Sequence, residues 1–122
     1  GNSDNTMVLK NKKIIKEMRE SQKLINNMLQ VSKDKKIDIY GMGVVGKNLM
    51  DILDDNDISI NYVFDKDARK YKTYSSVQLE NVRDIYENIV FVAVMRDNKE
   101  IIEKLKKQGY KKDNIYLIEN LV

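Results

Sequence analysis

The stretch KIDIYGMGVVGKNLMDIL, residues 36–53, changes its hydrophobic period in the middle. Ile37 and Ile39 alternate with polar residues and predict a short strand that ends at Gly41. From Val44 onward the apolar residues recur with helical spacing, which predicts an amphipathic helix that ends in DDND. A strand, a glycine turn and a helix in direct succession are typical of the start of a βαβ unit.

The same alternation continues to the end of the chain. Further strands are predicted over 58–64, over 88–95, where the apolar run suits a strand buried on both faces, and over 114–118. Residues 68–87 are the least readable part and suggest a loop, a short edge strand near TYSSV and a helical turn around 79–87. The sequence therefore predicts an α/β fold, a Rossmann-like parallel sheet of about five strands with flanking helices.

A helix over DNKEIIEKLKKQG has signals at both ends. Asp97 is the expected N-cap, Glu100 completes a capping box with it, and Gly109 is the expected C-cap in a left-handed conformation. Right-handed crossovers place the second strand on one side of the first and the 88–95 strand on the other. The glycine turn then lies at the topological switch point, where such sheets bind ligands.

The N-terminal segment differs from this body. Residues 1–7 are polar and are expected to be a disordered end or a cloning remnant, and residues 8–34 predict an amphipathic helix that serves as an arm or linker. This helix is expected to pack on the body or to pair with a second copy in a homodimer; a membrane-surface helix is the alternative, because lysines dominate its polar face. Residues 35–122 form the predicted nucleotide-binding domain.

Composition excludes several classes of function. The 122 residues include no cysteine and no histidine, which removes the commonest zinc ligands and nucleophile–histidine catalysis, so no catalytic and no metal-ligating residue is predicted. Residues 1–36 hold nine Lys/Arg against four Asp/Glu, and residues 37–122 hold thirteen against fifteen, so the body is not predicted to bind nucleic acid. No apolar run of membrane-spanning length and no signal peptide is present, and a cytoplasmic location is expected.

Gly41, Gly43 and Gly46 have the spacing G-x-G-x-x-G, with a strand before them and a helix after them. Gly41 allows the tight turn, Gly43 allows a pyrophosphate to approach the backbone, and Gly46 allows the helix to pack closely on the strand. Asp65 stands nineteen residues after Gly46, at the end of the second strand, where a carboxylate accepts ribose hydroxyls and favours NAD over NADP. The alternative is a turn of the same shape that binds no ligand, with Asp65 as a turn residue.

Basic residues near the turn are the other candidates. Lys66, Arg69 and Lys70 follow Asp65 and weaken its discrimination against a 2′-phosphate. Arg96 follows the 88–95 strand on the same edge of the sheet. Lys47 is more simply read as a solvated helix residue than as a phosphate ligand. The predicted cofactor-binding residues are Gly41, Met42, Gly43, Val44, Val45, Gly46, Asp65, Lys66 and Arg96.

The stretches 36–53, 60–67 and 88–118 together resemble the Rossmann-like modules of bacterial surface-polysaccharide proteins, such as the N-terminal domains of nucleotide-sugar epimerases and dehydratases. The resemblance implies a nucleotide-binding module for NAD(H) or a UDP-type nucleotide sugar. It also implies that catalysis belongs to a larger sugar-modifying enzyme domain, either in a partner or in a longer parent protein associated with the inner face of the membrane. The NAD-sensing regulatory domains of potassium channels and transporters fit the glycine turn comparably well and are the alternative. A stand-alone dehydrogenase needs a substrate-binding region for which this body has no space.

Overall fold

The computed structural model describes residues 2–122, with side chains described from residue 5 onward. The helices and strands follow one another as α1 (Asn2–Glu20), α2 (Lys23–Val31), β1 (Ile37–Tyr40), α3 (Val44–Asp55), β2 (Val63–Phe64), β3 (Lys70–Tyr71), β4 (Tyr74–Ser75), β5 (Ile89–Val92), α4 (Asn98–Gln108) and β6 (Ile115–Leu117). Short 3₁₀ turns occur at Leu79–Asn81, Lys112–Asn114 and Ile118–Asn120. Among these residues, no helix has both the length and the apolar character that crossing a lipid bilayer requires.

The central sheet is parallel and has four strands in the order β2-β1-β5-β6. This order confirms the predicted placement of β2 and β5 on opposite sides of β1. The number of strands is smaller than the five predicted, because the TYSSV segment pairs with β3 in a separate antiparallel hairpin and reaches the sheet only through one bridge between Val77 and Phe64. β2 is also shorter than the predicted 58–64 strand.

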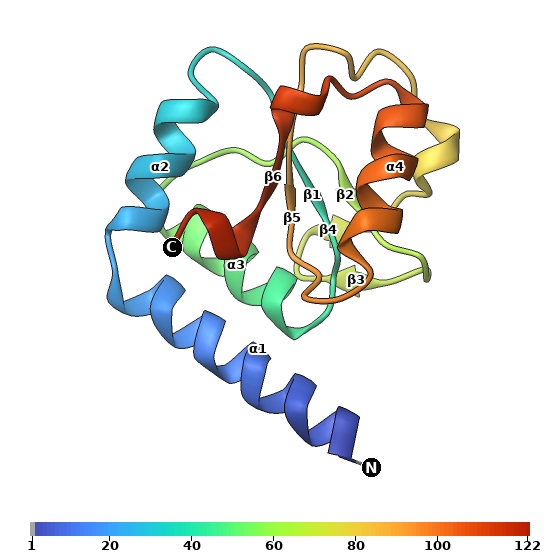
Figure 1. Cartoon of the computed structure of the whole chain (residues 1–122). Helices are drawn as coiled ribbons and strands as arrows, with labels where there is room; N and C mark the ends of the chain where they lie inside the picture. Colours follow the sequence, from blue (N-terminus) through green and yellow to red (C-terminus); the bar gives the residue numbers. More distant parts are fainter. Residues whose placement is uncertain (1) are drawn as a thin grey trace.

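The helices cover the sheet on both faces (Figure 1). One hydrophobic core lies between one face of the sheet and the helices α1, α2 and α3. From the two N-terminal helices it includes Ile14, Met18, Leu24 and Met28. The other core lies between the sheet and α4. The N-terminal segment is therefore part of the folded body rather than a free arm, and α1 begins at Asn2, within the range expected to be disordered.

The predicted single helix over the N-terminal segment is two helices. Ser21 separates them, and its hydroxyl accepts a hydrogen bond from the Lys23 backbone N–H at 3.1 Å. Serine hydroxyls compete in this way with the helical hydrogen-bond ladder. The chain therefore turns at residues 21–22. Before this turn, α1 lies across the carboxyl ends of the strands (Figure 1).

The predicted end of α4 is confirmed, and its predicted N-terminal cap is wrong. Gly109 has φ of +131° and closes the helix as expected. Asp97 is at the N-cap position, but it has φ of +56° and its side chain caps no N–H, so the predicted capping box with Glu100 does not form. A capping residue bonds the first turn from an extended backbone, and the left-handed backbone of Asp97, uncommon for a residue other than glycine, does not provide that geometry. The helical turn predicted around 79–87 is limited to Leu79–Asn81.

Candidate functional site

A cleft of about 510 Å³ lies at the carboxyl edge of the sheet. It is bounded by the ends of β1, β2 and β5, the first turns of α3 and α4, and the N-terminal half of α1. Of the predicted residues, Met42 and Gly46 do not line this cleft. The ones that do are Gly41, Gly43, Val44, Val45, Asp65, Lys66 and Arg96.

The glycine turn is shaped by contacts within the chain at two of its three glycines. Gly41 has φ of +114°, and a Cβ there would lie 2.7 Å from Val94 Cγ2. A Cβ at Gly46 would lie 1.8 Å from the Gly41 carbonyl oxygen, so α3 packs against the turn only because Gly46 has no side chain. Both residues are necessary for the fold itself.

Gly43 is different. It is the N-cap of α3, with φ of −80° and ψ of −163°, a conformation open to any residue. A Cβ there would meet no atom within 4 Å, and no side chain caps this end of α3. The unpaired N–H groups at the start of α3 therefore open directly onto the cleft, in an arrangement that suits an anion.

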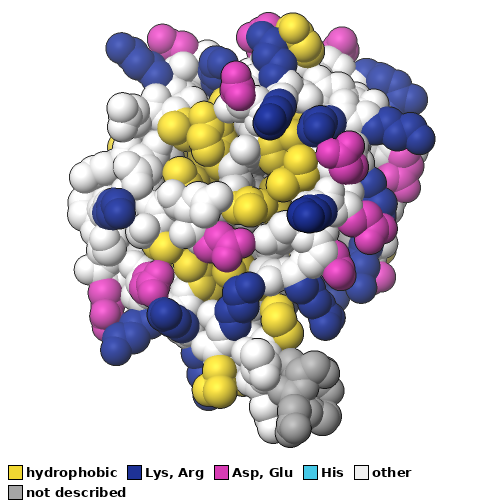
Figure 2. Space-filling view, viewed as in Figure 1, with side chains coloured by type: hydrophobic (Ala, Val, Ile, Leu, Met, Phe, Trp, Pro, Cys, Tyr) yellow, Lys and Arg dark blue, Asp and Glu magenta, His cyan; other side chains and the backbone are white. Residues whose placement is uncertain are grey.

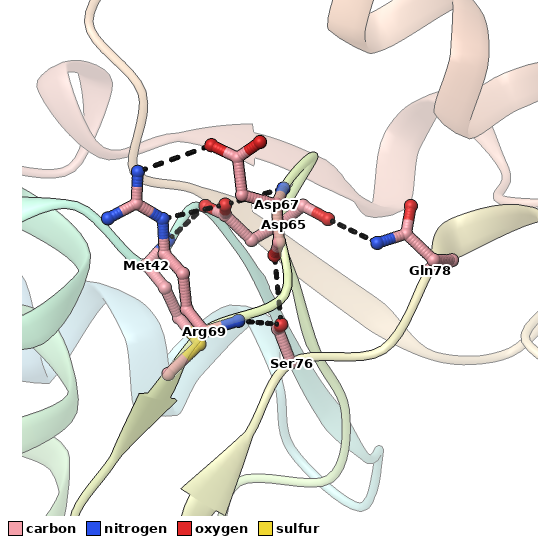
Figure 3. A network of polar contacts seen from close by, with 6 residues as sticks. All are labelled: Met42, Asp65, Asp67, Arg69, Ser76 and Gln78. Carbon is pink, nitrogen blue, oxygen red and sulfur yellow. Dashed lines mark hydrogen bonds and ion pairs between the residues drawn. The ribbon is translucent and has the colours of Figure 1, made fainter.

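Asp65 is bonded within the chain (Figure 3). Its Oδ1 accepts the Met42 backbone N–H at 2.9 Å, and its Oδ2 accepts the Asp67 N–H and the Arg69 Nε–H, both at 2.9 Å. The Met42 N–H is thus directed at Asp65 rather than at the cleft, and the carboxylate fastens the glycine turn to the end of β2. A carboxylate has about four acceptor positions, so about one remains for a ligand.

A second layer of contacts holds Arg69 in place. Its backbone N–H donates to Ser76 Oγ at 2.8 Å, and Ser76 Oγ donates to the Asp67 carbonyl at 3.0 Å (Figure 3). The guanidinium also reaches Asp67 at 3.4 Å, and its side chain is 42% exposed, against 10% for Asp65. Arg69 is therefore a cation at the cleft whose charge is largely balanced by its own neighbours.

The remaining charged residues of the cleft are less constrained. Lys66 and Arg96 are exposed. With Arg69 and Lys104 they give the cleft four cations, against the three carboxylates of Asp65, Asp97 and Glu100. The excess of positive charge is small, and it is consistent with a ligand that carries phosphate groups.

Several residues of the cleft were not predicted from the sequence. Tyr40 is the last residue of β1; burial raises the pKa of its phenol, so the hydroxyl stays protonated at neutral pH and can donate a hydrogen bond. Its position directly before Gly41 was the available signal. Lys104 on α4 and Met7, Val8 and Asn11 on α1 also line the cleft, and for α1 no local pattern could show it.

Lys47 is placed outside the cleft. Its ammonium lies 5.5 Å from the centre of the Tyr71 ring, on the side of α3 that contacts the β3–β4 hairpin. No cluster of three or more Asp, Glu, His or Cys side chains suited to a metal ion occurs among the described residues. Comparison of the chain with family models, with curated proteins and with solved structures found no match.

Proposed function

We propose that this chain is a nucleotide-binding module that recognises a nucleoside diphosphate group, either in NAD(H) or in a UDP-type nucleotide sugar. The observation that carries the proposal is Gly43. The fold itself needs Gly41 and Gly46 to be glycine, whereas Gly43 stands in open space at an uncapped helix N-terminus. A pyrophosphate that approaches the backbone there gives a reason for the missing side chain.

In this mechanism the backbone does most of the binding. The N–H groups of Val44 and Val45 and the positive end of the α3 dipole hold one phosphate, and Arg96 and Lys104 on the opposite wall balance the charge of the other. The module recognises its ligand and leaves the reaction to another domain. Its place in a bacterial surface-polysaccharide pathway rests on the sequence resemblance alone.

Ribose binding requires a rearrangement at Asp65. Both hydroxyls of a ribose need acceptors, and three donors already occupy most of the carboxylate. Arg69 is the only one of the three donors that belongs to a side chain, so it can move without the backbone and is the one that a ribose displaces. The exchange replaces the hydrogen bond from Arg69 to the Asp65 carboxylate by one from a ribose hydroxyl. Because the bond from Arg69 must be broken, ribose binds more weakly here than it would to a carboxylate without partners.

Calorimetric titration with NADH, UDP-glucose and AMP tests the proposal, with the pair Gly43→Asp and Gly43→Asn as variants. Both side chains are good N-caps and both have space, so each variant keeps or raises the stability of the fold. The two side chains have nearly the same shape, so their difference isolates charge. A carboxylate at the phosphate position repels the ligand, and we expect the Asp variant to bind at least about tenfold more weakly than the Asn variant.

The outcomes are distinct. Equal affinities for the Asp and Asn variants would place the phosphates away from Gly43 and remove the main support for the proposal. No heat with any of the three ligands at millimolar concentration would refute nucleotide binding itself. The urea midpoint of each variant shows that the protein titrated is folded.

A further inference from the structure

The N-terminal helix supplies one wall of the cleft. A strand–turn–helix unit with an acid after the second strand needs nothing from outside it to hold a pyrophosphate and a ribose. Here Met7, Val8 and Asn11 of α1 also face the cleft, beside the start of α3 and the end of β5. The cleft therefore has a wall that the strand–turn–helix unit does not supply, and α1 provides it.

The position of this wall is fixed from several sides. Lys10 Nζ donates to the Met95 carbonyl oxygen just beyond β5, at 3.1 Å. One to two turns further along α1, Ile14 and Met18 are buried in the core, with 5% and 1% of their surface exposed. Arg19 Nε donates to Asn48 Oδ1 of α3 at 2.8 Å. These contacts hold residues 7–11 in place beside the cleft.

Asn11 has an unused hydrogen-bonding group. Its Oδ1 is buried and has no hydrogen-bond partner, which is one of only three such side-chain atoms among the described residues. A buried acceptor without a partner is destabilising, because it has lost its hydrogen bonds to water and gained none in return. Since this oxygen gives up no bond, a turn of the amide toward a donor in the cleft is favourable.

The other side chains of α1 and α3 that line the cleft are apolar. Met7 is half-buried, Val8 is 51% exposed, and Val44 at the start of α3 is 53% exposed, all of them on the cleft. Figure 2 shows hydrophobic side chains at the surface along α1, beside Lys and Arg side chains. Apolar side chains with one amide acceptor among them suit a flat heteroaromatic ring that carries an N–H donor.

We propose that Met7, Val8 and Asn11 form a ring-binding subsite, in which the Asn11 amide oxygen accepts an N–H of a planar nitrogen heterocycle joined to the diphosphate. This inference rests on the proposed function. Nicotinamide, through its carboxamide, and uracil, through its imide, share this chemistry. Asn11 then selects the ligand and binds no phosphate.

The test measures the affinities of NADH and UDP-glucose for the full chain and for an Asn11→Leu variant. Pyrophosphate, which has no ring, is measured as a competitor of the better ligand. Leucine has nearly the shape of asparagine and no acceptor, so we expect at least about fivefold weaker binding of the ring ligand and an unchanged inhibition constant for pyrophosphate. The ligand that is weakened shows whether the subsite takes the uracil of UDP-glucose or a ring of NADH.

Asn5→Leu is the matched control, since Asn5 is an exposed residue of the same helix and outside the cleft. It should leave all three affinities unchanged. An Asn11→Ser variant repeats the test if the leucine variant does not fold. If each ligand, NADH and UDP-glucose, binds the Asn11 variants as tightly as it binds the wild type, the subsite is overturned and the proposed function stands. Failure of all three ligands to bind the wild type would instead refute the proposed function.

Discussion

Replacement of Tyr110 by phenylalanine tests the buried polar network at the other end of the sheet. Asp38, in the middle of β1, is fully buried, and none of the described residues gives it a cationic partner. Its Oδ1 accepts Asn61 Nδ2–H and the Tyr62 backbone N–H, and its Oδ2 accepts Asn88 Nδ2–H and the Tyr110 hydroxyl. The Tyr110 contact is the shortest of the four, at 2.5 Å.

The expected loss can be worked from this geometry. Tyr110→Phe removes one hydrogen bond to a buried charge, which contributes about 1.5–3 kcal/mol, and leaves Oδ2 with Asn88 alone. The ring stays, so its edge-on contact with Phe64, at 6.4 Å between centroids, is retained. With an m-value of about 2 kcal/mol/M, a loss of about 2 kcal/mol lowers the urea midpoint by about 1 M at pH 7.

The pH dependence gives a second, independent check. Burial, with the negative charge of Asp38, raises the pKa of the Tyr110 phenol, whereas the phenol in the unfolded chain has a pKa of about 10. Above pH 10 the unfolded state loses a proton that the folded state keeps, so wild-type stability falls as the pH rises. The phenylalanine variant lacks this proton. The difference in free energy of unfolding between wild type and Tyr110→Phe should therefore be about 1.4 kcal/mol smaller at pH 11 than at pH 7.

Tyr86→Phe is the matched control, because the same atom is removed from a ring that is 61% exposed. The cation–π contact of that ring with Lys111, 4.2 Å from the ring centre, does not need the hydroxyl. Its midpoint should stay within about 0.2 M of wild type. The reasoning is refuted if Tyr110→Phe behaves like this control at pH 7, or if its deficit is the same at pH 7 and pH 11.

Two further variants test the contacts around α3. Gly46→Ala places a Cβ 1.8 Å from the Gly41 carbonyl, so we expect a loss of about 3 kcal/mol in urea unfolding, while Gly43→Asn loses nothing; normal stability of the alanine variant would contradict the close packing of α3. The pKa of Asp51 is lowered: partial burial raises it, but the hydrogen bonds from Lys72 and Tyr71 outweigh burial. Its contribution is therefore present above about pH 4 and lost as the pH falls through the folded pKa, so Asp51→Asn should be less stable than wild type at pH 7, and this deficit should shrink as the pH is lowered below about 4. A deficit that does not shrink on acidification would argue against this ion pair.

The sheet order could be predicted from the sequence because it depends on short-range signals. The period of two at Ile37 and Ile39, the apolar run of β5 and the handedness of crossovers are enough to place β2 and β5 beside β1. The predicted number of strands was wrong because TYSSV forms part of a hairpin instead of a fifth strand of the sheet. The choice between sheet and hairpin depends on how Tyr71 and Tyr74 contact α3. Their hydroxyls donate to Asp51 and Asp54, twenty residues earlier, a contact that no local pattern encodes.

The wall made by α1 could not be predicted for the same reason. Periodicity identified an apolar face with Ile14 and Met18, which are indeed buried, but periodicity does not say against what. The same face would serve a dimer. Only the packing of α1 on α3 brings residues 7–11 to the cleft, thirty residues or more from the glycine turn in sequence.

The glycine motif is weaker evidence for a nucleotide ligand than its spacing indicates, since most of its residues are needed for the fold. Gly41 and Gly46 are needed for the turn and its packing, and Asp65 fastens the turn through the Met42 N–H. A sequence could keep all three for stability after losing any ligand, so Asp65→Ala is a poor test: it weakens the turn and the ribose site together. Gly43 alone is free of such a duty. A charge added there, compared with its neutral isostere, separates binding from folding, whereas the other positions of the motif combine the two.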